Sequence, residues 1–179
     1  YSESSLEASW IRSVADQSTR IRFKNFGTIS AQIGFETFPC EGDCKFCVFG
    51  ASHTTFPETK MSLEEIVSHA KDLTKDGLLS VLWLMSMSRL DWDNFLEIVA
   101  AVRNVIPPWT MLASNVGDMS LEKAKELKAA GLSSAYHIIR LREGIDTRLD
   151  PKRRLQTIHN IQEAGLYWGF CCEPIGPEH

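Results

Sequence analysis

The stretch "GLLSVLWLM", residues 77–85, contains the pattern that decides the fold of this chain. Gly77 follows a segment with helical spacing of apolar residues, and the run after it is apolar and of strand length. A glycine that ends a helix directly before such a run is typical of alternating helices and strands. The same Gly-Leu junction returns at 131–132 and at 165–166. We therefore expect an α/β fold of repeated βα units, with parallel strands in a sheet covered by helices.

Four segments have a helical period, and each begins with a residue that caps helices. Ser62 and Glu65 have the spacing of a capping box, and Asp91, Ser120 and Asp150 can cap the other three segments. Strand-like runs lie between the helices. They span residues 27–38, 78–85, 109–114, 133–140 and 166–172. Residues 1–24 predict a polar helical extension outside the sheet, which leaves 25–179 for the α/β domain.

Five strands that alternate with four helices can form an open doubly wound sheet or a barrel, and the periodicity does not separate the two. In both folds, functional side chains lie in the loops that follow the strands. Here those loops contain the residues 38–50, 86–89, 115–118, 140–143 and 173–178.

The composition excludes several classes of protein. A net charge of −4 lacks the basic excess of a nucleic-acid-binding chain, and no apolar run is long enough to cross a bilayer. The first thirty residues contain no apolar segment typical of a signal peptide, so we expect a cytoplasmic chain. The chain starts at Tyr1 without an initiator methionine and stops soon after its last expected strand, which is typical of a piece of a longer protein.

Three of the five cysteines lie in "CEGDCKFC", residues 40–47, directly after the first expected strand. This clustering is unlike the disulfide framework of a secreted protein. Thiolates are soft ligands that suit zinc or iron–sulfur clusters. One interpretation is a non-catalytic zinc-binding α/β domain that uses Cys40, Cys44, Cys47 and His53. The other is a 4Fe–4S cluster with three cysteine ligands and one open iron.

The spacing of Cys40, Cys44 and Cys47, with Phe46 as the aromatic before the last cysteine, resembles the cluster motif of the radical S-adenosylmethionine (SAM) superfamily. Residues 135–178 resemble the strand-four to strand-five region of the biotin synthase-like subgroup. The resemblance implies a TIM-like (βα)n barrel, partial or full, truncated here after strand five. The second and third strands carry no cysteine for the auxiliary cluster of biotin synthase, so we do not expect biotin synthase itself.

By this resemblance the chain is expected to be an enzyme in which Cys40, Cys44 and Cys47 bind a 4Fe–4S cluster. SAM would bind the open iron and be cleaved reductively to a 5′-deoxyadenosyl radical, which abstracts hydrogen from a small-molecule substrate. The implied role is cofactor or metal-cofactor biosynthesis, with an electron donor such as flavodoxin or ferredoxin and without nucleic acid or membrane. A SAM-binding relative that has lost turnover is a further alternative.

The resemblance also implies which residues contact SAM. The expected contacts are Phe46, Ser86, Asn115, Arg140, Arg142, Glu143, Arg148, Ile175 and Gly176. Solvated charges or ion pairs are the alternative for the charged members of this set. Tyr136 and His137 are neighbours on one strand, so only one of them should point into the barrel and contact substrate. For Trp83, Trp109, Cys171 and Cys172 we expect packing in the core.

Overall fold

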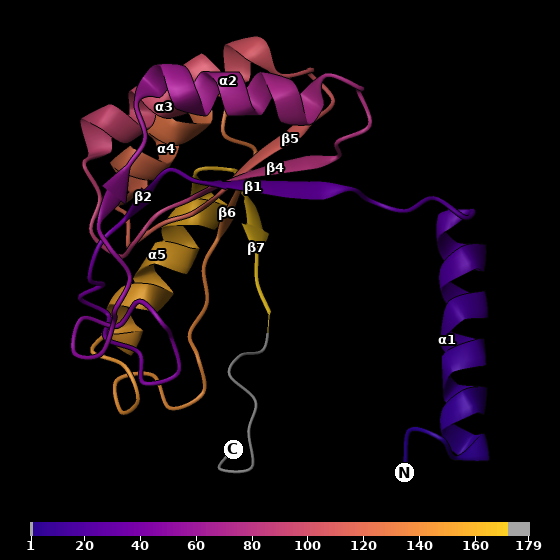
Figure 1. Cartoon of the computed structure of the whole chain (residues 1–179). Helices are drawn as coiled ribbons and strands as arrows, with labels where there is room; N and C mark the ends of the chain where they lie inside the picture. Colours follow the sequence, from indigo (N-terminus) through magenta and orange to yellow (C-terminus); the bar gives the residue numbers. More distant parts are fainter. Residues whose placement is uncertain (1, 172–179) are drawn as a thin grey trace.

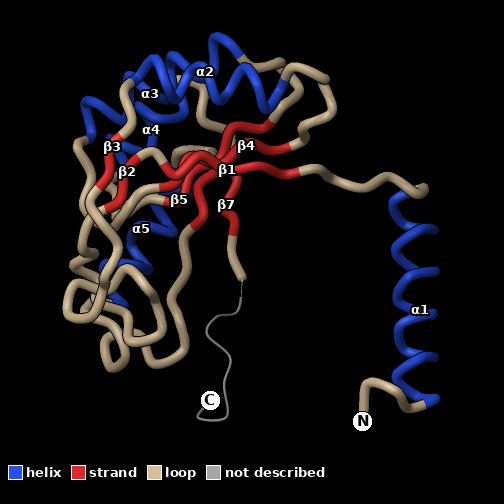
Figure 2. Tube along the Cα trace, in the orientation of Figure 1, coloured by secondary structure: helices blue, strands red, loops and turns tan. Residues whose placement is uncertain are grey.

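The computed structural model of the chain describes residues 2–171 and contains a parallel sheet with helices on one side (Figures 1 and 2). The strands pair in the order β1, β4, β5, β6 and β7, and every pair is parallel. Their bounds are Ser30–Gly34, Val81–Met85, Met111–Asn115, Ser134–Tyr136 and Tyr167–Gly169. Each new strand is added to the same edge, whereas the order reverses in a doubly wound sheet. The sheet therefore has the winding of a barrel.

The four helices between these strands begin at the residues expected to cap them. They are α2 (Leu63–Thr74), α3 (Trp92–Val105), α4 (Leu121–Ala129) and α5 (Pro151–Glu163). The side chains of Ser62, Asp91, Ser120 and Asp150 each accept a hydrogen bond from a backbone N–H of the first turn. Glu65 completes the capping box with Ser62. These caps satisfy N–H groups that have no partner within the helix, so local chemistry sets where each helix starts.

Helices α2 to α5 lie on one side of the sheet, and the apolar core lies between them and the strands (Figure 1). Leu82 and Leu84 of β4 and Leu112 of β5 are fully buried on this side. Phe95 of α3 stacks on Phe35, with ring centroids 5.6 Å apart. No described helix covers the opposite, inner side of the sheet (Figure 1).

The expected first strand, residues 27–38, is divided into two. β1 ends at Gly34, and β2 (Glu36–Thr37) leaves the main sheet to pair antiparallel with β3 (Thr59–Lys60). The backbone N–H of Met61 donates to the carbonyl of Phe35 at 2.8 Å. The β2–β3 pair joins the two ends of the segment that contains the three cysteines, so this segment is a closed loop.

The N-terminal segment forms helix α1 (Leu6–Phe23), which stands apart from the sheet in Figure 1. Ser5 caps it, and none of its residues is buried. Among the described helices, none is both long and apolar enough to cross a bilayer.

Phe95→Ala is expected to lower the free energy of unfolding by about 3–5 kcal/mol, because it leaves a cavity where two aromatic rings now stack. Urea denaturation measures this loss. Phe26→Ala is the matched control, since Phe26 is 82% exposed, and it should change stability by less than about 0.5 kcal/mol. Equal losses in the two variants would contradict the placement of the core.

Candidate functional site

The cysteine loop, residues 38–58, lies at the edge of the sheet where the parallel strands end. Each cysteine of the motif begins a tight turn. The carbonyls of Cys40, Cys44 and Cys47 accept hydrogen bonds from the N–H groups of Asp43, Cys47 and Gly50 at 3.0–3.1 Å. The N–H of Cys40 also donates to the carbonyl of Phe49 at 2.8 Å. Backbone geometry therefore places the three thiols on successive turns of one loop.

The three thiols differ in exposure. Cys44 is buried, whereas Cys40 and Cys47 are half-buried. Burial raises the pKa of Cys44 to about 11, although the positive charge of Arg140 acts in the opposite direction. The thiol of Cys40 lies 3.3 Å from the hydroxyl of Ser88, in the loop after β4. Without a metal Cys44 is a thiol at neutral pH, so a bound metal has to displace its proton.

The donor set suits an iron–sulfur cluster better than a zinc ion with four protein ligands. Both ring nitrogens of His53 have partners, because Nε2 lies 2.7 Å from the carbonyl oxygen of Cys47 and Nδ1 lies 3.1 Å from the hydroxyl of Ser52. His53 is therefore not placed as a fourth zinc ligand. Within residues 2–171, no group of three His, Cys, Asp or Glu side chains is arranged around one metal ion. A 4Fe–4S cluster takes each cysteine on a different iron, so its thiols need not converge on one point.

The loop from 140 to 149, after β6, contains the charged residues expected to contact SAM, and Glu143 holds this loop together. Its side chain is 1% exposed. One carboxylate oxygen accepts from the backbone N–H of Arg140 at 2.9 Å, and the other accepts from the hydroxyl of Thr147 at 2.6 Å. The guanidinium of Arg154 lies 3.7 Å away. Both oxygens of Glu143 are thus engaged within the protein.

Arg142 and Arg148 also have acidic partners. Arg142 pairs with Asp146 four residues later, and Arg148 pairs with Asp43 of the cysteine loop at 2.9 Å. Arg140 lies 3.8 Å from Glu143 and is largely buried. Each of these arginines therefore has an acidic neighbour within the protein, and its contact with SAM stays a prediction.

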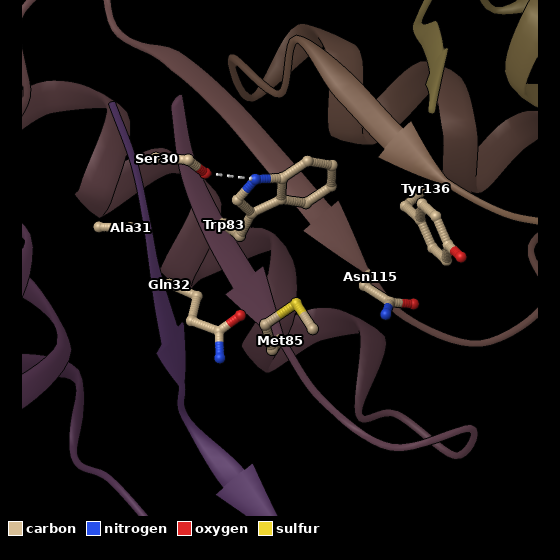
Figure 3. Close-up of a pocket in the computed structure, with 7 residues that line it drawn as sticks. All are labelled: Ser30, Ala31, Gln32, Trp83, Met85, Asn115 and Tyr136. Atoms are coloured by element: carbon tan, nitrogen blue, oxygen red, sulfur yellow. Dashed lines mark hydrogen bonds between the residues drawn. The ribbon is translucent and has the colours of Figure 1, made fainter. Parts of the chain in front are cut away.

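The other expected SAM contacts lie in several places. Ser86 donates its hydroxyl to Glu36, a buried carboxylate that the sequence analysis missed within an apolar run. Asn115 is at the end of β5, beside Met85 (Figure 3). Phe46 is 44% exposed on the cysteine loop. Ile175 and Gly176 lie outside the described residues.

A cavity of about 400 Å³ occupies the inner side of the sheet. Figure 3 shows its lining residues, which are Ser30, Ala31, Gln32, Trp83, Met85, Asn115 and Tyr136. The rings of Trp83 and Tyr136 meet edge to face with centroids 6.4 Å apart. Tyr136 is therefore the inward-facing member of its pair, and His137 is outside the cavity and 1% exposed.

His137 belongs to a buried polar network that sequence analysis did not find. Its Nε2 lies 3.0 Å from the carboxylate of Asp118, which also accepts from the hydroxyl of Thr157 and lies 3.6 Å from Arg154. Burial opposes ionisation of Asp118, but the hydrogen bond from His137 and the charge of Arg154 outweigh it and lower the pKa of Asp118. The network ties the loop after β5 to helix α5.

Three expectations about packing are wrong. Trp83 lines the cavity and is not part of the apolar core. Cys171 is exposed rather than buried, and its sulfur lies 2.9 Å from the hydroxyl of Tyr136. Trp109 is 67% exposed, although its indole N–H donates to the carbonyl of Gly77. Cys172 lies outside the described residues. The errors at Cys171 and Trp109 arise because the strands are shorter than the strand-like runs: Trp109 precedes β5, and Cys171 follows β7.

A family model described as the radical SAM superfamily matches residues 37–171. The chain is 34% identical over 146 residues to a biotin synthase of Campylobacter jejuni subsp. jejuni strain 81-176, which covers 76% of this chain and 51% of the relative. It is 29% identical over 136 residues to a biotin synthase of Clostridioides difficile strain 630, covering 71% and 41%. The chain thus spans about half the length of these curated relatives or less.

Solved structures with the same fold include methylornithine synthase (PylB), with a TM-score of 0.73, 18% identity and coverage of 89% of this chain and 48% of that one. The FeFe-hydrogenase maturase HydG has a TM-score of 0.71 at 17% identity, with coverage of 88% and 37%. At these identities the similarity establishes the fold, which agrees with the expected TIM-like barrel.

The stability of the protein is expected to fall as the pH drops from 7 to 5. Burial lowers the pKa of His137 below its usual 6.5, although the hydrogen bond to Asp118 acts in the opposite direction. The unfolded chain therefore binds this proton more readily, and the stabilisation present above pH 6.5 is lost as the pH falls through the folded pKa. Each unit by which the pKa is lowered corresponds to about 1.4 kcal/mol.

Urea denaturation of wild type and His137→Gln at pH 7 and pH 5 measures the effect. The other histidines are common to both proteins, so the difference isolates His137. The variant should lose less stability than wild type between the two pH values. Parallel curves would show that His137 does not titrate in this environment.

Proposed function

The chain belongs to the radical SAM superfamily, and on this premise we propose that it is an enzyme whose cysteine loop binds a 4Fe–4S cluster and S-adenosylmethionine. Cys40, Cys44 and Cys47 would hold the cluster. When bound, the reduced cluster and SAM supply a 5′-deoxyadenosyl radical that abstracts hydrogen from a substrate carbon. The observation that carries the proposal is the position of a three-cysteine loop at the carboxyl end of a barrel-type sheet, where active sites of such folds lie.

The residues around the cysteine loop support this assignment by their charge. Cys44 is the buried ligand, and Arg140 is a cation that opposes the effect of burial on its ionisation. Arg154 is a second, 6% exposed cation in the same network. A cluster with three thiolates adds negative charge to a partly buried site, and these cations would stabilise that charge.

We further propose that the cavity on the inner side of the sheet binds the small-molecule substrate. None of its described lining residues is charged. The amide side chains of Gln32 and Asn115 have no hydrogen-bond partner in the part of the chain that the structure describes, so they can bind polar groups of a ligand. The aromatic rings of Trp83 and Tyr136 provide flat apolar surface beside them (Figure 3). The cavity suits an uncharged, partly planar portion of a substrate.

A role in cofactor or metal-cofactor biosynthesis is part of the proposal. It is supported by the names of the relatives, which include biotin synthase and a hydrogenase maturase. The reaction requires an electron donor such as flavodoxin or ferredoxin, and we propose a cytoplasmic protein that acts without nucleic acid or membrane.

Anaerobically reconstituted, dithionite-reduced protein is expected to give a 4Fe–4S EPR signal that changes when SAM is added, because SAM binds the open iron. Formation of 5′-deoxyadenosine under the same conditions separates an active enzyme from a SAM-binding chain without turnover. A 4Fe–4S EPR signal that stays the same when SAM is added would contradict the proposal. Stoichiometric zinc in place of iron and sulfide would favour the zinc-binding alternative.

Cys44→Ala is expected to abolish assembly of the cluster, since two cysteines remain in the loop. Iron and sulfide analysis after reconstitution measures the loss. Cys171→Ala is the matched control. The thiol of Cys171 is exposed and lies after the end of β7, outside the cysteine loop, so its removal should leave the iron content unchanged. Full iron content in Cys44→Ala would show that this thiol is not a ligand.

A further inference from the structure

The cysteine loop is joined to the 140–149 loop by contacts on both sides of Cys44. The residue that follows Cys44, Lys45, donates its backbone N–H to the carbonyl of Asp146 at 2.9 Å. Gly42, two residues before Cys44, accepts from the backbone N–H of Arg148 at 2.8 Å. These two backbone hydrogen bonds hold together segments about a hundred residues apart in the chain. They lie on either side of Cys44, the buried cysteine of the motif.

Asp146 reinforces the first of these contacts through its side chain. Its carboxylate accepts from the ammonium group of Lys45 at 3.0 Å and from the guanidinium of Arg142. These hydrogen bonds lower the pKa of Asp146 to about 2, so the carboxylate is ionised. Lys45 lies between Cys44 and Cys47 in the motif. Both its backbone N–H and its ammonium group donate to Asp146, so two hydrogen bonds fix its position.

Arg148 reinforces the second contact in the same way. Its guanidinium lies 2.9 Å from the carboxylate of Asp43, which is 6% exposed. Asp43 has a left-handed backbone, with φ of 43°, and its other carboxylate oxygen accepts from the N–H of Ser52 at 2.8 Å. A non-glycine residue in this conformation needs such support from its surroundings. Arg148 thus helps to hold the turn between Cys40 and Cys44.

We propose that Asp146 and Arg148 are positioning residues that hold the cysteine loop on both sides of Cys44 and set the spacing of the three thiols before iron binds. The residues of the 140–149 loop would then influence the cluster indirectly, because they fix the backbone of the loop that contains its cysteine ligands. The use of the loop for a cluster rests on the proposed function, whereas the junction of the two loops can be tested in the chain without iron.

The test measures the rate at which iodoacetamide alkylates each cysteine of the reduced, iron-free protein, resolved by peptide mass spectrometry. In wild type, Cys44 should react more slowly than exposed Cys171. Asp146→Ala and Arg148→Ala should each raise the rate at Cys44 about fivefold, because each removes hydrogen bonds between charged groups that resist local opening. Cys171 serves as an internal reference whose rate should not change.

Asp16→Ala is the matched control, since Asp16 forms an exposed ion pair with Arg20 in α1, away from both loops. It should leave all rates unchanged. Rates at Cys44 equal to wild type in both variants would overturn the proposal. An equal rise at Cys44 and Cys171 would also overturn it, because it would mean general loosening of the domain.

If Asp146→Ala loses its helical circular dichroism, Arg148→Ala decides the question, since the side chain of Arg148 is 68% exposed and its removal leaves no cavity. A second measurement uses the reconstituted protein, in which both variants should release iron to a chelator faster than wild type. The alkylation rates do not involve iron. Failure of the protein to bind a cluster would therefore contradict the proposed function, but it would not affect the alkylation rates that test the junction of the two loops.

Discussion

The winding of the sheet in one direction is the constraint on which the rest of the structure depends. Parallel pairing brings the carboxyl ends of the five strands of the main sheet to one edge, and strictly sequential order keeps helices α2 to α5 on one side. The other side is therefore left for a cavity. The cysteine loop and the 140–149 loop meet because both follow strands of this sheet. A reversal of strand order would have separated them.

The charged residues at this edge form two connected groups with different tasks. His137 and Arg154 are buried and Asp118 is half-buried, and these residues tie strand ends to helix α5. Asp43 and Asp146 have exposed cations as partners, and they tie one loop to another. Burial of a charge without a partner is costly, which explains why Asp118 and Arg154 lie close to each other. Contacts of the second kind contribute less to overall stability and more to the position of a segment.

The fold of this chain and its proposed function rest on different features of the structure. Solved structures with the same fold bear the names of a methylornithine synthase and a hydrogenase maturase, so this fold alone does not identify a substrate. The cysteine loop is the element that the proposed chemistry requires. The cavity between Gln32, Trp83 and Tyr136 has no charged residue among its described lining residues. The ion-pair partner of an arginine such as Arg148 comes from another loop, so it is not evident from the residues beside it in the sequence.

The sequence by itself determined the features that depend on neighbouring residues. Caps such as Ser62 and Asp150, the glycines that end helices, the strand-like runs and the spacing of the cysteines are all local, and the structure has the helices and strands where they predict. The tertiary structure alone decided the barrel winding, the break after Gly34 and the partners of Arg148 and Glu143. These features depend on contacts between segments far apart in the chain, and neither residue type nor spacing specifies which distant group will lie within hydrogen-bonding distance.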